Sequence, residues 1–260
     1  MPAQAPASAG ESERAEPEAT VQADAETAGC EAEDAPAAFR FQVQPEFHPV
    51  PLGTDDDEEA FDEQMREFAR DYWGDREELE PLRRFTAAMY GVNSQQLAAE
   101  GTVYHALGIF PIGGTVEGAQ SPERVSRCTL SVSVRDLDNP APHLAAAGIA
   151  ETLDKGQESG EVQLITLPAG PAVVHIAGSR AVWELPDGED QERFFVRIEV
   201  WMPFPEDDRL LLLCLSTADV QDLYHYQAVL ADIADTITFG DAEADLAAVG
   251  GTEPQAHPFG

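Results

Sequence analysis

The pattern of apolar and polar residues predicts two helices at about residues 55–100. Apolar side chains recur there at intervals of three and four residues, which is the spacing of one face of a helix. The first apolar stripe consists of Phe61, Met65, Phe68 and Tyr72. The second consists of Leu79, Leu82, Phe85 and Met89. Both stripes are expected to face the hydrophobic core.

Beyond about residue 100 the pattern becomes typical of strands. Residues 129–135 alternate, which predicts a strand with Leu130, Val132 and Val134 on its buried face. Turn sequences rich in Pro, Gly and acidic residues separate four further predicted strands, at 161–167, 172–184, 192–202 and 209–216. A closing helix is predicted from a last apolar stripe, which consists of Leu223, Tyr226, Leu230 and Ile233.

The last two strands differ in how their faces are expected to be covered. Residues 210–215 are apolar throughout, which predicts a central strand covered on both faces. The strand at 192–202 has one apolar face and one amphipathic face, so the second is expected to be partly open. The amphipathic face carries Phe195, Arg197, Glu199 and Trp201.

Together these elements predict one α+β domain at residues 39–239, with an antiparallel sheet of about five to six strands packed with helices. Within it, residues 55–100 form the helical part, and residues 101–239 form the sheet and the C-terminal helix. Residues 1–38 contain nine acids, one Arg and no aromatic residue, and residues 240–260 contain four acids and no Lys or Arg. Neither segment has enough apolar surface to offset the entropy of ordering, so both are predicted to be disordered acidic tails.

Charge narrows the range of partners. The formal net charge of the 260-residue chain is −34, and lysine occurs once, at Lys155. Such a field repels phosphate backbones and anionic headgroups, so neither nucleic acid nor a membrane surface is an expected partner. A basic protein is the partner that this charge favours.

The chain shows no segment for targeting or membrane insertion. The N-terminus lacks a basic region followed by an apolar one. The longest purely apolar run has six residues, at 210–215, far fewer than a membrane span needs. The three cysteines form no CxxC pair, so neither a disulfide framework nor a zinc site is predicted. We therefore expect a cytoplasmic protein.

No catalytic motif is present, and four residues remain as candidates for proton transfer. His105 lies in TVYHALGIF at 102–110, which is also predicted to be a strand, and His175 lies in the strand predicted at 172–184. On the last helix His225 follows Asp222 by three residues, so the two could share a face as a base and the group that orients it. No metal ligand set, nucleotide-binding loop or other cofactor motif is found, so no metal or cofactor is predicted.

The C-terminal half also carries a recognisable order of motifs. LPAGPAVV at 167–174 is followed by WMPFP at 201–205, DRLLLLCLST at 208–217 and ADIADTITF at 231–239. Over about residues 100–239 this order resembles uncharacterised actinobacterial proteins and, through them, the Mog1/PsbP-like α/β sandwich family. The resemblance implies an antiparallel sheet packed with helices, used as a binding or accessory module without catalytic residues.

Three functions are compatible with these observations. The leading one is a non-catalytic accessory or protein-interaction protein that uses Phe195, Arg197, Glu199 and Trp201 as its contact set. The second is an enzyme, hydrolase-like, that uses the histidine and carboxylate groups. The third is an acidic chaperone linked to secretion, which shields a basic or amphipathic client.

Overall fold

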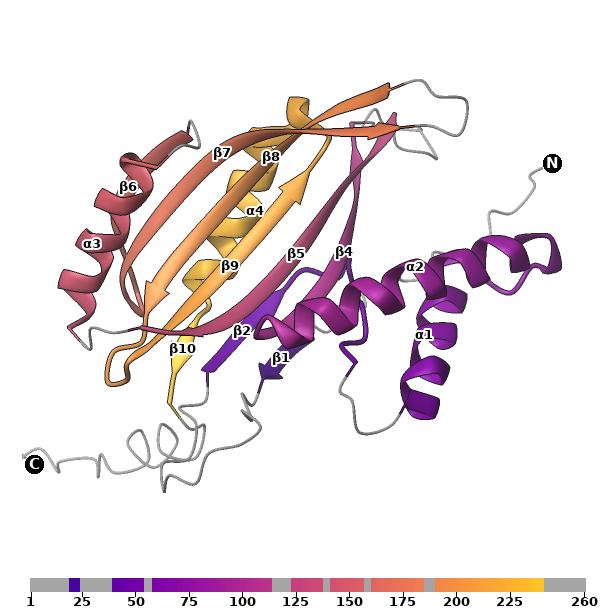
Figure 1. Cartoon of the computed structure of the whole chain (residues 1–260), viewed down its shortest axis with the longest axis horizontal. Coiled ribbons are helices and arrows are strands. Elements are labelled where there is room, and N and C mark those ends of the chain that lie inside the picture. The colour runs from indigo at the N-terminus through magenta and orange to yellow at the C-terminus, as the bar shows by residue number, and fades with distance from the viewer. Residues whose placement is uncertain are drawn as a thin grey trace, which may run out of the picture.

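A computed structural model of the chain describes residues 19–23, 39–53, 58–113, 123–137, 141–156, 160–184 and 190–240. Its main feature is a seven-stranded sheet in which every neighbouring pair is antiparallel (Figure 1). In spatial order the strands are β3 (Phe47–Pro49), β4 (Thr102–Ile112), β5 (Arg124–Asp136), β9 (Arg209–Thr217), β8 (Asp190–Pro203), β7 (Gly170–Glu184) and β6 (Gly160–Leu167).

The predicted α+β class with an antiparallel sheet is confirmed, but the sheet has more strands than the five to six expected. One additional strand is β3, which sits at an edge beside β4. Pro45, Pro49 and Pro51 lie in or beside it, and this segment is not among the strands predicted above. An edge strand needs hydrogen bonds on one side alone, so a short proline-flanked segment is tolerated in this position.

A second, small sheet joins the two ends of the described chain. It consists of β1 (Ala19–Ala23), β2 (Phe39–Val43) and β10 (Thr238–Phe239), with β2 in the middle. β1 falls within residues 1–38, where a disordered tail was predicted. The rest of that segment and residues 241–260 lie outside the described residues.

The main core lies between one face of the large sheet, β2 and α4 (Leu223–Asp235). Alternation along β8 turns Val196, Ile198, Val200 and Met202 toward this core, as predicted. The predicted stripe of α4 also faces it, with Tyr226, Leu230 and Ile233 fully buried. β9 lies between β5 and β8, and its residues Leu210 to Leu213 are all buried, which confirms a central strand covered on both faces.

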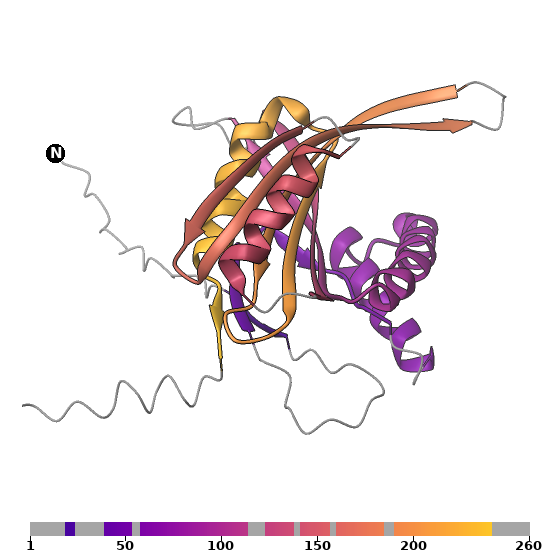
Figure 2. The same ribbon diagram turned by 60° about the vertical axis from the view of Figure 1, so that its left-hand side comes forward.

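The opposite face of the sheet carries the other three helices, α1 (Glu58–Trp73), α2 (Glu80–Ala99) and α3 (Pro142–Asp154). Figures 1 and 2 show α4 on one side of the sheet and these helices on the other. α3 lies against β6, β7 and β8. α1 and α2 pack near β3 and β4, where Phe61, Met65 and Phe68 form a small second core with Leu107. None of the helices in the described part of the chain is long and apolar enough to cross a membrane.

The stripe predicted for the second helix does not lie in the core. Leu82, Phe85, Met89 and Val92 all point to solvent, and Phe85 is 65% exposed. α2 instead turns a more polar face toward α1 and the sheet, with Thr86 and Ser94 buried. The Nε1–H of Trp73 donates a hydrogen bond of 2.8 Å to Oγ1 of Thr86, which gives this polar side chain a partner inside the contact. The prediction that Leu82, Phe85 and Met89 are core residues is therefore wrong.

Candidate functional site

A line of polar side chains crosses the sheet on the face opposite α4. Residues directly opposite each other on neighbouring strands have side chains on the same face. The register from β4 to β7 places five such residues in sequence: His105, Ser131, Cys214, Glu199 and His175. Two of the histidines predicted as candidates and one residue of the predicted contact set thus belong to one cross-strand row.

The end of this row at β7 and β8 is a buried ion-pair network. The Nδ1–H of His175 donates a hydrogen bond of 2.9 Å to Oε2 of Glu199, and both side chains are at least nine-tenths buried. Nε of Arg197 lies 3.0 Å from Oε1 of the same carboxylate, and the Nε1–H of Trp201 donates to it at 3.3 Å. A Cβ atom at Gly160 would lie 2.6 Å from Nε2 of His175, so glycine there makes room for the imidazole. The carboxylate of Glu199 is therefore held from several sides.

The middle of the row has no activated nucleophile. Burial raises the pKa of the Cys214 thiol to about 12, so this cysteine is protonated at neutral pH and is not a thiolate. Burial also lowers the pKa of His105, which keeps that imidazole neutral. Three strands separate the two histidines, which places them roughly 19 Å apart at the usual strand spacing. They do not converge on one reaction centre.

Asp222 and His225 lie elsewhere and do not form the predicted pair. Alternation places Phe110 on the α4 side of the sheet, and the His225 ring packs against it with ring centroids 4.9 Å apart. Both guanidinium NH2 groups of Arg124 hydrogen-bond to the carboxylate of Asp222. Within the described residues, no hydrogen bond joins Asp222 to His225, and Nε2 of His225 is buried without a partner. Asp222 therefore links β5 to the start of α4, and its role is structural.

The Arg124–Asp222 contact should show in the pH dependence of stability. The hydrogen bonds from Arg124 hold the pKa of Asp222 below its usual range, so the contribution of the carboxylate is complete above about pH 4. It is lost as the pH falls through the lowered pKa, because the protonated carboxyl no longer pairs with the guanidinium as an anion. We expect Asp222→Asn to lower the urea midpoint at pH 7 and the difference from wild type to shrink below pH 4. Asp232→Asn, an exposed change on α4, serves as the control, and a difference that is constant with pH would contradict this account.

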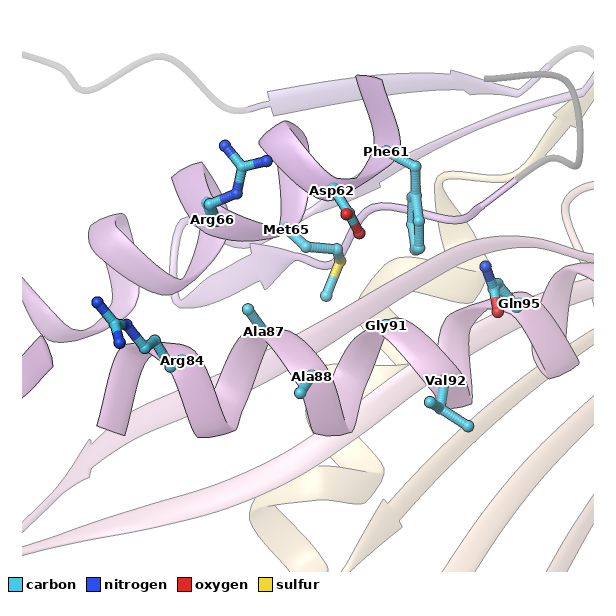
Figure 3. Close-up of a pocket in the computed structure, with 10 residues that line it drawn as sticks. All are labelled: Phe61, Asp62, Met65, Arg66, Arg84, Ala87, Ala88, Gly91, Val92 and Gln95. Carbon is cyan, nitrogen blue, oxygen red and sulfur yellow. The ribbon is translucent and has the colours of Figure 1, made fainter. Parts of the chain in front are cut away.

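A groove lies between α1 and α2, with a volume of about 410 Å³. Phe61 and Met65 of α1 point across it toward three small residues of α2, Ala87, Ala88 and Gly91 (Figure 3). Short side chains at these positions leave the groove open. The remaining lining residues, which include two arginines and an acid at its border, are Asp62, Arg66, Arg84, Val92 and Gln95. The groove adjoins the exposed apolar stripe through Val92.

The four residues predicted as a contact set do share one face of β8. Phe195, Arg197 and Trp201 are half-buried there, and Glu199 is buried in the network described above. The sequence did not point to the α1–α2 groove. The groove depends on the small residues at 87, 88 and 91 of α2, which lie opposite Phe61 and Met65 of α1. This combination can be recognised only once α1 and α2 are known to pack together.

The chain matches no protein-family model, and no curated protein is significantly similar to it in sequence. Within the described residues, no three His, Cys, Asp or Glu side chains come together in a way that could hold a metal ion.

Proposed function

We propose that this protein is a non-catalytic interaction module that binds an amphipathic, basic helix of a partner protein on α1 and α2. The observation that carries the proposal is the exposed apolar stripe of α2, formed by Leu82, Phe85, Met89 and Val92. A single exposed leucine is ordinary, but a row of four large apolar side chains on one helix marks an interaction surface. The resemblance to a sandwich family that serves mostly as binding modules is in keeping with this proposal.

The shape of the surface suits a helix. The stripe residues follow intervals of three, four and three, so they form one ridge along α2. Beside the ridge lies the groove of about 410 Å³, floored by Ala87, Ala88 and Gly91. An amphipathic helix places its apolar face into such a groove through residues spaced three and four apart.

The charge around the surface argues for a basic partner and against a second copy of the chain. α1 carries six acidic and two basic residues. Two copies would bring their α1 helices together and add like charges, in chains that each have a net charge of −34. Lysines or arginines beside the apolar face of a partner helix would face the acids of α1 and raise the rate and specificity of association.

The test uses the full chain and a model peptide, an amphipathic helix of Leu, Ala and Lys labelled with a fluorophore. We expect Phe85→Ser/Met89→Ser to weaken its binding at least tenfold in an anisotropy titration at 0.15 M salt. The matched control is Leu144→Ser on α3, because Leu144 is 67% exposed and thus as accessible as Phe85. Neither variant changes the charge of the protein, so non-specific attraction of a basic peptide is the same in all three proteins.

Three outcomes would reject the proposal. The first is equal binding of the Lys peptide to the wild type and the double variant. The second is equal binding of a peptide in which Glu replaces Lys, since charge would then have no part in recognition. The third is a stable dimer in sedimentation that the double variant abolishes, because the occupant of the stripe would then be a second copy of the chain.

A further inference from the structure

A second cavity, separate from the α1–α2 groove, lies where α1 and α2 meet the sheet. Its volume is about 320 Å³, at the small end of the range for ligand pockets. Tyr72 of α1 and Tyr90 of α2 line one side of it. β4, β5, β8 and β9 form the other side, with Leu107, Ile109 and Phe195 among the apolar residues there. Aromatic rings thus border the cavity from the helices and from the sheet.

Four residues with a hydroxyl group line this cavity. They are Tyr72 and Tyr90 on the helices, and Thr129 and Ser216, which are paired directly across β5 and β9. Burial raises the pKa of the Tyr90 hydroxyl and the nearby Tyr72 raises it further, so the hydroxyl is protonated and able to donate. Among the described residues, none of these four hydroxyls has a hydrogen-bond partner, although other hydroxyls close by, on Ser126 and Thr217, do.

Two positive charges border the same cavity, from Arg127 on β5 and Arg193 on β8. Among the described residues, eight other arginines form ion pairs with carboxylates. Arg127 and Arg193, like the exposed Arg76 and Arg135, form no ion pair in that part of the chain. In a protein with 49 acidic and 15 basic residues, two such guanidinium groups beside one cavity make it locally positive. Guanidinium groups bind carboxylates and phosphates through paired N–H donors.

We propose that this cavity binds a small organic anion, in which a carboxylate or phosphate group is attached to a flat apolar body. The anionic group contacts Arg127 and Arg193 and accepts hydrogen bonds from the hydroxyls. The flat body stacks among the rings of Tyr72, Tyr90 and Phe195, since aromatic side chains favour stacked and edge-to-face contacts. This site is separate from the α2 stripe, so the anion-binding proposal and the helix-binding proposal can be tested independently.

Calorimetric titration of the full chain at 0.15 M salt tests the proposal with four probes: benzoate, phenyl phosphate, inorganic phosphate and uncharged benzyl alcohol. We expect benzoate, phenyl phosphate or both to bind with a dissociation constant below about 1 mM. Arg127→Met/Arg193→Met is expected to weaken that binding at least tenfold. Tyr90→Phe, which keeps the ring and removes the hydroxyl, is expected to weaken it to a smaller degree.

The matched control is Arg135→Met. Arg135 is exposed on the same face of the same strand as Arg127, and eight residues along it, about 26 Å away. It should bind the probes as the wild type does, and all variants should unfold at the same urea concentration. Preference for benzoate would identify carboxylates as the ligand class, and preference for phenyl phosphate would identify phosphate esters. The proposal is overturned if no probe binds, if benzyl alcohol or inorganic phosphate binds as tightly as the aromatic anions, or if the double variant binds them unchanged.

Discussion

Leu213→Ala is expected to lower the free energy of unfolding by about 3–5 kcal/mol, whereas Leu82→Ala should change it by no more than about 0.5 kcal/mol. Leu213 lies in the middle of the central strand β9 and is 1% exposed. It is opposite Val132 of β5 and Val200 of β8, and belongs to the core under α4. Its replacement removes buried methyl groups and leaves a cavity that strand neighbours on both sides cannot fill. Leu82 is 42% exposed, so the same change there removes few contacts.

Urea unfolding followed by far-UV circular dichroism measures both free energies. The two losses can be compared directly, because both variants remove the same atoms from the same chain. If Leu213→Ala does not fold, Leu213→Met provides the milder test, with an expected cost below about 1.5 kcal/mol. Equal losses at positions 213 and 82 would show that α2 buries its stripe in solution. The exposed surface on which the proposed interaction function depends would then not exist.

The contrast between these two leucines shows what local sequence pattern determines. Period-two alternation identified the buried face of β8, and the apolar run identified β9 as a strand with both faces covered. Period 3.6 identified the buried stripe of α4. In β8 and α4, one side of the element is apolar and the other is not, whereas β9 is apolar on both sides, so burial has one solution in each case.

α2 has no such single solution. One side of it carries Leu82, Phe85 and Met89, and another carries small and weakly polar residues, including Thr86 and Ala87. Local pattern places the large apolar side inward. Burial of the second side becomes favourable because the Nε1–H of Trp73 of α1 donates a hydrogen bond to Thr86 and because Ala87 and Tyr90 pack against the apolar residues of α1. These contacts depend on tertiary packing, which overrides the local pattern.

The candidate sites could not be predicted because the order of the strands in the sheet differs from their order in the chain. β5 lies between β4 and β9 in the sheet, although α3 and β6 are the elements that follow it in the chain. This arrangement brings Ser131 beside Cys214, and Thr129 beside Ser216, across more than 80 residues of sequence. The sequence identified His105 and His175 by residue type alone. That they share a row with Glu199 follows from strand order and register, which no local motif encodes.

Glu199→Leu is expected to lower the free energy of unfolding by about 1–3 kcal/mol, because it leaves the buried imidazole of His175 without its acceptor. The side chain of Arg197 reaches solvent, whereas His175 and Glu199 are both buried on the face of the sheet opposite α4. Replacement of both partners by apolar residues, His175→Leu/Glu199→Leu, removes the unpaired group as well. The double variant should therefore be more stable than Glu199→Leu alone.

A double-mutant cycle of the four proteins, measured by urea unfolding at pH 7, gives the coupling free energy between the two side chains. We expect a coupling of about 2 kcal/mol or more, which is within the range for residues that share a buried network. Single-variant losses that simply add in the double variant would mean that the network contributes no more than its packing. A large coupling together with retained peptide and anion binding would assign this row to stability. The enzyme hypothesis would then lose His175 and Glu199, a pair of described residues whose geometry resembles a base and the residue that orients it.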